Sequence, residues 1–311
     1  MQRALWMAGL ASLVLTACSG GEDATGADVE ADAGTAAAEQ DSGTVAAEAQ
    51  SAAVSGTLEW ALAGDWRGEN GARDEFRHPA ETLAFFGIDP SDTVIEIWPG
   101  GGWYTEILAP WLSANGGTYM AAHFPADSES EVRRRSRASF EDRFTGSDLF
   151  GDVVILDWGP DNQGLGAPGS ADAVLTFRNV HNWMRGGFTE RAFSDFYAVL
   201  RPGGVLGVVE HRLPDTREQD PLAGSGYVQE AYIIAIAREA GFELAGSSEI
   251  NANPADTADH PNGVWTLPPS RSGWEAEGFD STPYEAIGES DRMTLLFRKP
   301  ETDPVPAEDE G

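Results

Sequence analysis

The sequence predicts an α/β fold in which a mostly parallel sheet of seven strands is covered by helices on both faces. Hydrophobic residues make up 41% of the 311 residues, which is enough for a large core. Seven short apolar runs along the chain are typical of buried strands. Segments with helical character separate most of these runs, and such alternation is typical of a parallel sheet between two helical layers.

Four of the expected strands lie in the first half of the folded region. A helix in "HPAETLAFFGIDPSD" is expected to end at Gly87, before a turn. The strand Val94–Trp98 is followed by a helix over Tyr104–Leu112. A second strand in "GTYMAAHF" ends near His123, and the charged segment Asp127–Arg143 predicts an exposed helix. The runs "DVVILDW" and "ADAVLTF" are the third and fourth strands.

The second half continues the alternation. Thr189–Leu200 has apolar residues at helical spacing and predicts a helix, after which "RPGG" is expected to turn the chain into a fifth strand, "VLGVVEH". A helix over Val228–Ala240 ends at Gly241. The sixth and seventh strands are "FELAGSSEI" and "RMTLLFRKP". Between them, Asn251–Ile287 is rich in Pro, Asp, Asn and Gly, and predicts a long, partly irregular insertion.

The first residues resemble the signal of a bacterial lipoprotein. Arg3 precedes an apolar stretch, Ala4–Ala17, which is shorter than the roughly 20 residues that a membrane-spanning helix needs. The stretch ends in "LTAC" at Cys18, the only cysteine of the chain. The resemblance implies removal of residues 1–17, a lipid on Cys18, and a protein tethered to a membrane and facing the periplasm or the cell surface.

The charge is strongly acidic and is partly local. The net charge is −31, and such a surface repels phosphate backbones, so nucleic acid is not expected as a partner. Residues 18–57 contain eight acids and no base, and their composition predicts an acidic disordered tether. Residues 301–311 predict an acidic disordered tail. The folded domain is therefore expected over residues 58–300.

Four stretches of that domain, in this order, resemble the seven-stranded, Rossmann-like methyltransferases that use S-adenosylmethionine (SAM). They are "VIEIWPGGG", "LRPGGVLGVVEH", "AREAGFEL" and "MTLLFRKP". The nearest resemblance is to a bacterial group of predicted methyltransferases with the motifs "EIWPGGGWYTEILAP" and "LTFRNVHNW", and it covers about His78 to Pro300. It implies the methyltransferase fold, with strand order 3-2-1-4-5-7-6 and the seventh strand antiparallel, and SAM as cofactor.

The glycine loop after the first strand departs from the superfamily pattern at one position. The pattern is an acid followed by glycine at every second position. Glu96, Gly100 and Gly102 match it, whereas Trp98 replaces the first glycine. Glycine at such positions permits positive φ and close approach of a ligand. The resemblance implies that Glu96, Gly100, Gly101 and Gly102 bind SAM, with Trp98 pointing away into the sheet; a tight turn without a ligand is the alternative.

Two further positions bear on the cofactor. His123 ends the second strand, where the superfamily usually has an acid that binds the ribose hydroxyls. A neutral imidazole has one donor and one acceptor, so it can hold one hydroxyl. Asp157, after the third strand, matches a position that often contacts the adenine. The resemblance thus implies that His123 and Asp157 bind the cofactor, although Asp157 is equally compatible with a solvated turn.

Polar side chains are expected to gather where strands one, two, four and five end. Three of the five histidines fall there, namely His123, His181 and His211. In open α/β sheets ligands bind outside these ends, where the strand order reverses. Glu96, Asn179, Asn182 and Glu210 join the same rim, and the aromatic residues Trp103, Phe177 and Trp183 are expected as core or pocket wall.

Two functions remain open for this rim. In the first, a small molecule is methylated, with His181 or His211 as general base. The side chains expected to face that substrate are Asn179, Asn182, Trp183 and Glu210. In the second, an exported protein that no longer uses SAM binds a metal or another small ligand in the same crevice. His123, His181 and His211 would then bind a divalent metal such as zinc or copper. An unfolded exported chain cannot carry SAM from the cytoplasm, which favours the second function, whereas the resemblance favours the first.

Overall fold

The computed structural model describes residues 53–161 and 164–302. Cys18, the expected signal segment and nearly all of the expected tether and tail lie outside the described residues, so those assignments stay predictions. Within the described ranges, no helix is both long enough and apolar enough to cross a membrane.

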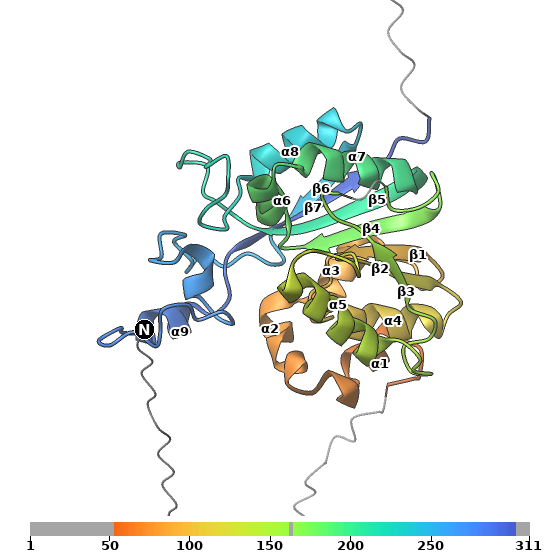
Figure 1. Ribbon diagram of the computed structural model, residues 1–311, viewed down its shortest axis with the longest axis horizontal. Helices are drawn as coiled ribbons and strands as arrows, with labels where there is room; N and C mark the ends of the chain where they lie inside the picture. The colour runs from red at the N-terminus through yellow and green to blue at the C-terminus, as the bar shows by residue number, and fades with distance from the viewer. Residues whose placement is uncertain (1–52, 162–163, 303–311) are drawn as a thin grey trace, which may run out of the picture. The chain divides into compact units, whose positions relative to one another are not determined.

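The centre of the unit is one seven-stranded sheet with the order β3-β2-β1-β4-β5-β7-β6 (Figure 1). β7 pairs antiparallel with β5 and β6, and the other pairs are parallel. The strands are β1 (Thr93–Ile97), β2 (Thr118–His123), β3 (Val154–Asp157), β4 (Ala171–Phe177), β5 (Leu200–His211), β6 (Glu243–Ser248) and β7 (Arg292–Arg298). The predicted Rossmann-like methyltransferase fold is therefore confirmed.

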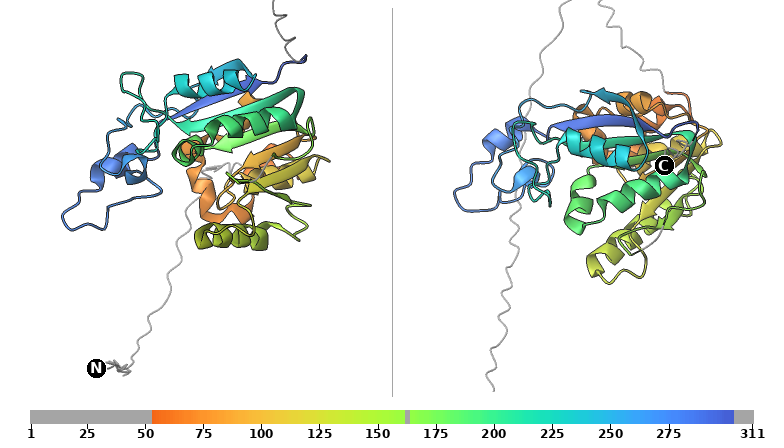
Figure 2. Two further views of the ribbon diagram at one scale, coloured as in Figure 1. Left: turned by 45° about the horizontal axis from the view of Figure 1, so that its top comes forward. Right: turned by 90° about the horizontal axis from the view of Figure 1, so that it is seen from above.

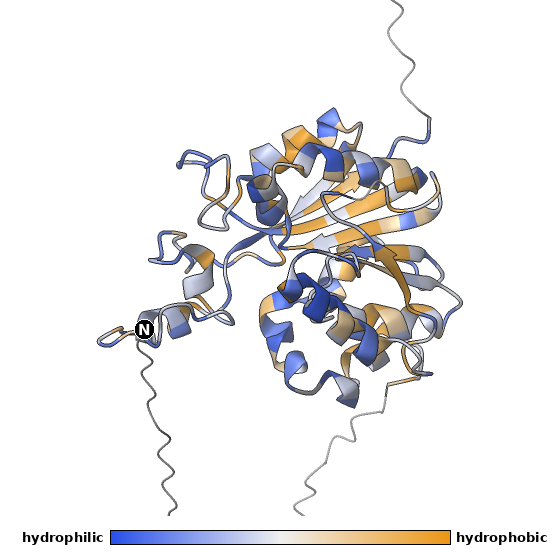
Figure 3. Ribbon diagram, viewed as in Figure 1, coloured by the Kyte–Doolittle hydropathy of each residue, from blue (hydrophilic) through white to orange (hydrophobic). Residues whose placement is uncertain are grey.

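Helices cover both faces of this sheet. The helices are α1 (Leu58–Leu62), α2 (Asp74–Arg77), α3 (Pro79–Phe86), α4 (Thr105–Ser113), α5 (Glu131–Phe144), α6 (Val180–Gly186), α7 (Thr189–Val199), α8 (Glu230–Glu239) and α9 (Thr282–Ile287). Successive residues of β1 point to opposite faces of the sheet. Val94 therefore packs with α3 and α4, whereas Ile95 packs with α6, α7 and α8. Figure 3 shows the resulting concentration of hydrophobic residues in the central strands.

Four local predictions differ from the structure. The "RPGG" segment lies inside β5, which begins at Leu200 and is irregular in its pairing with β4. Ser130 caps α5 and accepts a hydrogen bond from the Arg133 amide, so this helix begins later than Asp127. Helix α6 and the N-terminal elements α1, η1 (Asp65–Arg73) and α2 were not predicted. These are short and lack a sustained apolar period, so tertiary packing decides them.

The predicted insertion, Asn251–Ile287, is irregular except for η2 (Gly263–Thr266) and α9. It lies beyond one end of the strands (Figure 2). This is the end at which the parallel strands finish, because the insertion and the carboxyl ends of β1, β4 and β5 line one cavity.

Candidate functional site

A cavity of about 450 Å³ opens at the carboxyl ends of β1, β4 and β5. Six segments far apart in the chain build it: the N-terminal helices, the glycine loop, the β4–α6 connection, the end of β5, the insertion and the residues before β7. Its lining includes Arg73, Arg77, Glu96, Trp98, Gly100, Gly101, Trp103, Phe177, Arg178, Asn179, His181, Asn182, His211, Trp265 and Glu289. The cavity lies where the strand order reverses between β1 and β4, as the sequence predicts for a ligand site.

The glycine loop has the backbone of a three-glycine loop even though its first position is a tryptophan. The φ angles are +47° at Trp98, +60° at Gly100 and +85° at Gly102. A Cβ at Gly100 would meet nothing within 4 Å, whereas one at Gly102 would overlap the ring of Phe144 on α5. Gly100 and Gly101 therefore line the cavity as predicted, while Gly102 serves packing and does not line it.

Trp98 turns away from the loop and packs against the core on one face of the sheet. Its ring packs against the rings of Phe124, Trp158, Trp183 and Phe188, with centroids 4.8 to 6.1 Å apart. Its Nε1 donates to the carbonyl oxygen of Trp158 at 3.2 Å, just after Asp157. The indole thus fills the space beside β3, where the resemblance places the adenine of SAM, and its other side lines the cavity.

Glu96 lines the cavity from β1 but is almost completely buried. Its Oε2 accepts hydrogen bonds from Tyr119 Oη at 2.6 Å and Thr105 Oγ1 at 3.2 Å. Burial raises the pKa of this carboxyl to about 7, against the lowering effect of these hydrogen bonds. The acid of the loop is therefore a cavity residue that exists in both protonation states near neutral pH.

His123 and Asp157, predicted to bind cofactor, lie outside the cavity lining. His123 is buried under α5 against Phe140, its Nδ1 accepts from the Phe124 amide, and its ring lies close to the backbone of Gly100. Burial and then Arg137 lower the pKa of His123 to about 4, so its ring is neutral. Asp157 forms an ion pair with Arg137 at 2.7 Å. The side chains of His123 and Asp157 are therefore both engaged by residues of α5.

The β4–α6 connection places three of the predicted rim residues on the cavity. Asn179, His181 and Asn182 line it, and the Asn179 amide also donates to the carbonyl oxygen of Ile97 at 2.9 Å, which ties β4 to the glycine loop. Trp183, however, is fully buried among the core residues of α6 and α7. The prediction that Trp183 faces a substrate is wrong, because its side chain points to the opposite side of this short helix.

Glu210, at the end of β5, orients the histidines from behind the cavity wall. It is fully buried, and it accepts hydrogen bonds from the backbone amides of Val180 at 2.6 Å and His211 at 2.8 Å. Its Oε1 lies 3.0 Å from His181 Nδ1. Glu210 does not line the cavity. Its carboxylate fixes the ring of His181, so Glu210 is a positioning residue where direct substrate contact was predicted.

His181 and His211 meet at the cavity with their rings 5.5 Å apart. The Nδ1 atom of His211 is 2.6 Å from Ser290 Oγ. Burial, and then the proximity of His181 and of nearby arginines, lowers the pKa of His211 well below its usual value. Ligand atoms of His181, Glu210 and His211 lie within 4.8 Å of one another, and His123 is not in this group. The predicted three-histidine metal site is therefore not formed.

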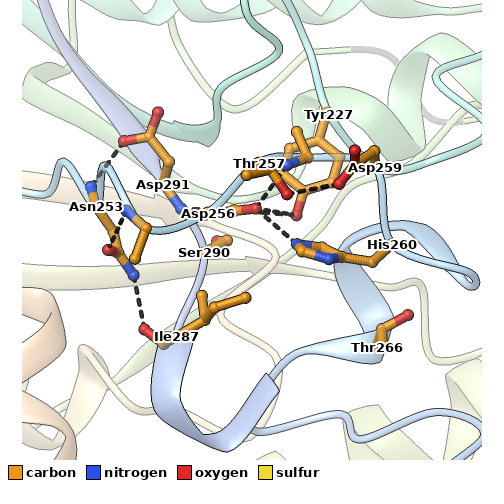
Figure 4. Close-up of polar contacts among 12 residues, drawn as sticks. Tyr227, Asn253, Asp256, Thr257, Asp259, His260, Thr266, Ile287, Ser290 and Asp291 are labelled. Atoms are coloured by element: carbon orange, nitrogen blue, oxygen red, sulfur yellow. Dashed lines mark hydrogen bonds and ion pairs between the residues drawn. The ribbon is translucent and has the colours of Figure 1, made fainter. Parts of the chain in front are cut away.

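A network of polar contacts ties the insertion to Tyr227 and to the segment before β7 (Figure 4). The carboxylate of Asp256 accepts from Tyr227 Oη at 3.0 Å, from the Asp291 amide at 2.8 Å, and bonds His260 Nε2 at 2.8 Å. Asn253 donates to two backbone carbonyl oxygens of the segment before β7. The network holds the insertion, which includes the cavity residue Trp265, and the segment with Ser290 in place.

Sequence reasoning missed the arginines. Arg73 ends η1, Arg77 ends α2 and Arg178 follows β4, and all three line the cavity. Glu289 and Arg292, at the start of β7, complete the group. No local pattern connects residues that are so far apart in the chain. The one available signal was Arg178 in "LTFRNVHNW", which stands next to the predicted site residue Asn179.

No protein-family model matches the chain, and no curated protein matches its sequence. Among solved structures, the chain is similar to a SAM dependent methyltransferase from Aquifex aeolicus, with 17% identity, a TM-score of 0.47, and coverage of 58% of this chain and 87% of the other. It is also similar to the cyclase SpnF, with 18% identity, a TM-score of 0.49, and coverage of 73% and 81%. A SAM-dependent methyltransferase from Mesorhizobium loti has 12% identity, a TM-score of 0.42, and coverage of 75% and 100%. These likenesses concern the fold and assign no function to this chain.

Proposed function

We propose that the protein is a SAM-dependent methyltransferase that acts on a small molecule in the cavity above β1, β4 and β5. The observation that carries the proposal is the glycine loop, whose backbone has positive φ at all three positions of the superfamily pattern, Trp98 included. A tryptophan held in this conformation costs about 1 kcal/mol or more, and such strain clusters at functional sites. Gly100 and Gly101 leave room for a ligand close to the backbone.

The residues of the cavity fit such a reaction. SAM, when bound, supplies a methyl group activated by the positive charge on its sulfur. The loop backbone at Gly100 and Gly101 and the carboxyl of Glu96 would hold it. Trp103 and Phe177 supply an aromatic wall for the apolar part of a ligand; the Trp103 ring already contacts the guanidinium groups of Arg77 and Arg67 at 4.7 and 5.2 Å. The fit is incomplete beside β3, where the Trp98 indole must move or the adenine must lie elsewhere.

His181 is the proposed general base. Its Nδ1 faces the carboxylate of Glu210, and in that arrangement Nδ1 carries the hydrogen and Nε2 keeps its lone pair. His181 Nε2 receives the proton that the oxygen or nitrogen of the acceptor loses as it takes the methyl group. Glu210 then stabilises the imidazolium.

The test is calorimetric titration of the chain without its first 17 residues, with Cys18→Ser, using SAM. We expect micromolar binding that Gly100→Trp abolishes, because the new side chain fills the cavity. Gly146→Trp is the matched control: Gly146 also has positive φ, +72°, and open space around it, but lies outside the cavity lining. Absence of SAM binding to the parent protein, or equal loss in both variants, would contradict the proposal.

A second candidate function is binding of a divalent metal such as zinc or copper. The close approach of His181, Glu210 and His211 favours it, together with the anchoring of both Nδ1 atoms by Glu210 and Ser290. Such outer contacts are typical of histidines that bind a metal through Nε2. Metal analysis of the same sample decides between the two: near-stoichiometric metal that is lost in the His181→Ala, His211→Ala double variant, without SAM binding, supports this candidate.

We further propose that the protein is exported and attached to a membrane by a lipid on Cys18. The lipobox-like "LTAC" supports this. Mass spectrometry of the protein from a bacterial membrane fraction should show a lipid-modified cysteine at the N-terminus. The Cys18→Ser variant should be recovered without lipid, and an unprocessed, unmodified parent chain would refute the proposal.

A further inference from the structure

The cavity carries positive charge in a protein whose net charge is −31. Three arginines line it, Arg73, Arg77 and Arg178, and Arg292 stands directly behind them. The carboxyls on the lining are Glu289 and Glu96, and Glu96 is only partly ionised near neutral pH. A local surplus of guanidinium groups inside an acidic protein needs an explanation, because uncompensated buried charge is costly.

Glu289 is shared among three of the four guanidinium groups. Its carboxylate lies 2.8 Å from Arg73 Nε, 3.0 Å from Arg77 Nε and 3.1 Å from Arg292 Nη1. Burial would raise the pKa of this carboxyl, but the guanidinium groups around it lower it to about 2. One carboxylate cannot satisfy so many donors, and Arg73 Nη2 is buried without a hydrogen-bond partner.

Arg178 is the arginine of this group that makes no direct ion pair, although its charge lowers the pKa of Glu289 and opposes the rise in that of Glu96. Its side chain forms neither an ion pair nor a hydrogen bond with any residue of the ranges 53–161 and 164–302, yet it is only partly exposed and lines the cavity. Its φ is +62°, a conformation that is unfavourable for a long side chain. Its backbone is held there by a 2.7 Å hydrogen bond from its amide to the carbonyl oxygen of Val209. A strained, unpaired cation at a cavity is placed for a ligand.

We infer that Arg178 and Arg73 form an anion-binding subsite that holds the carboxylate of a small organic molecule. A guanidinium group presents two parallel N–H donors that match a carboxylate. Trp103, Tyr104 and Phe177 line the wall beside it and suit an apolar body attached to the anion. The inference rests on the proposed function only in taking the molecule to be a reactant of methyl transfer. The carboxylate then belongs either to the methyl acceptor or to the amino-acid end of SAM.

The experiment titrates the chain with benzoate and with its neutral analogue benzamide, following the fluorescence of the cavity tryptophans. We expect benzoate to bind at least about tenfold more tightly than benzamide. Arg178→Gln should remove this preference, and Arg178→Lys should keep part of it. Arg135→Gln is the control, because Arg135 is an exposed arginine of α5 with one local ion pair. Equal binding of the two probes to the parent protein, or an unchanged preference in Arg178→Gln, overturns the inference.

Two further measurements separate a binding role from a structural one and identify the source of the carboxylate. Arg178→Gln should raise the melting temperature of the free protein, because it removes an unpaired charge; a lower melting temperature would show a structural role and overturn the inference. If SAM binds about tenfold more tightly than its decarboxylated form, and Arg178→Gln removes the difference, the carboxylate is that of the donor. If SAM and its decarboxylated form bind equally tightly while the benzoate preference holds, the bound carboxylate is that of the methyl acceptor. Benzoate binding through Arg178 without any SAM binding would refute the proposed methyl transfer and leave the subsite standing.

Discussion

The two sides of the crevice at the strand ends differ in what fills them. On the side of β2 and β3, Trp98, Phe124 and Trp158 pack against one another, and Asp157 is paired with Arg137. On the side of β4 and β5, the cavity is open, and its lining includes three arginines, Arg73, Arg77 and Arg178, and the histidines His181 and His211. A second cavity of about 640 Å³ lies on the side of β2 and β3, lined by residues that follow these strands, among them Arg133 and Asp161. The aromatic group around Trp98 therefore fills only the space next to the glycine loop, and we call this part the closed half.

The largest expected effect comes from matched tryptophan truncations in the two halves. Trp158 is fully buried in the closed half, so Trp158→Ala should lower the free energy of unfolding by about 3–5 kcal/mol. Trp265 is only partly buried at the cavity, and Trp265→Ala should cost about 1 kcal/mol. Denaturant unfolding measures both. Equal losses would mean that the two halves are equally well packed, which would break the comparison.

The second effect is a pH dependence at the border of the two halves. The native pKa of Glu96, about 7, lies above the ordinary value of 4.5, so folding favours the protonated form. Its contribution to stability is complete below pH 4.5 and is lost as the pH rises to 7, by about 3 kcal/mol. Glu96→Gln stays neutral, so its stability relative to the parent protein should rise by this amount over that range.

The comparison with the parent protein matters because His123 acts in the opposite direction. Its native pKa, about 4, is below the ordinary 6.5, so the stability it contributes is complete above pH 6.5 and is lost as the pH falls toward 4. Taking the difference between Glu96→Gln and the parent protein cancels this effect. A stability difference that does not change with pH would show that the positive charge of Arg178 keeps Glu96 ionised over this pH range.

The sequence could predict the sheet and the meeting of His181 with His211, because carboxyl ends of parallel strands share one edge. It could also place Gly100 and Asn179 on that edge. It could not predict that His123 and Asp157 face α5, because both halves of the crevice have strand ends of the same kind. The arginine group could not be predicted for a different reason. Its members come from four segments of the chain, and only tertiary packing brings them together.

A smaller expected effect, the difference in stability between two variants of Trp98, tests the closed half most directly. Trp98→Gly removes a half-buried ring from the aromatic group but also relieves the positive φ of a tryptophan, so the net cost should be about 2 kcal/mol. Trp98→Ala loses the same ring without relieving the backbone, and should cost about 1 kcal/mol more than Trp98→Gly. If the indole occupies the adenine position, both variants should bind SAM more tightly than the parent protein, although both are less stable. Calorimetric titration of the three proteins gives the answer. Weaker SAM binding in both variants would mean that Trp98 contacts the ligand directly, and that the ring in the closed half is a wall of the site.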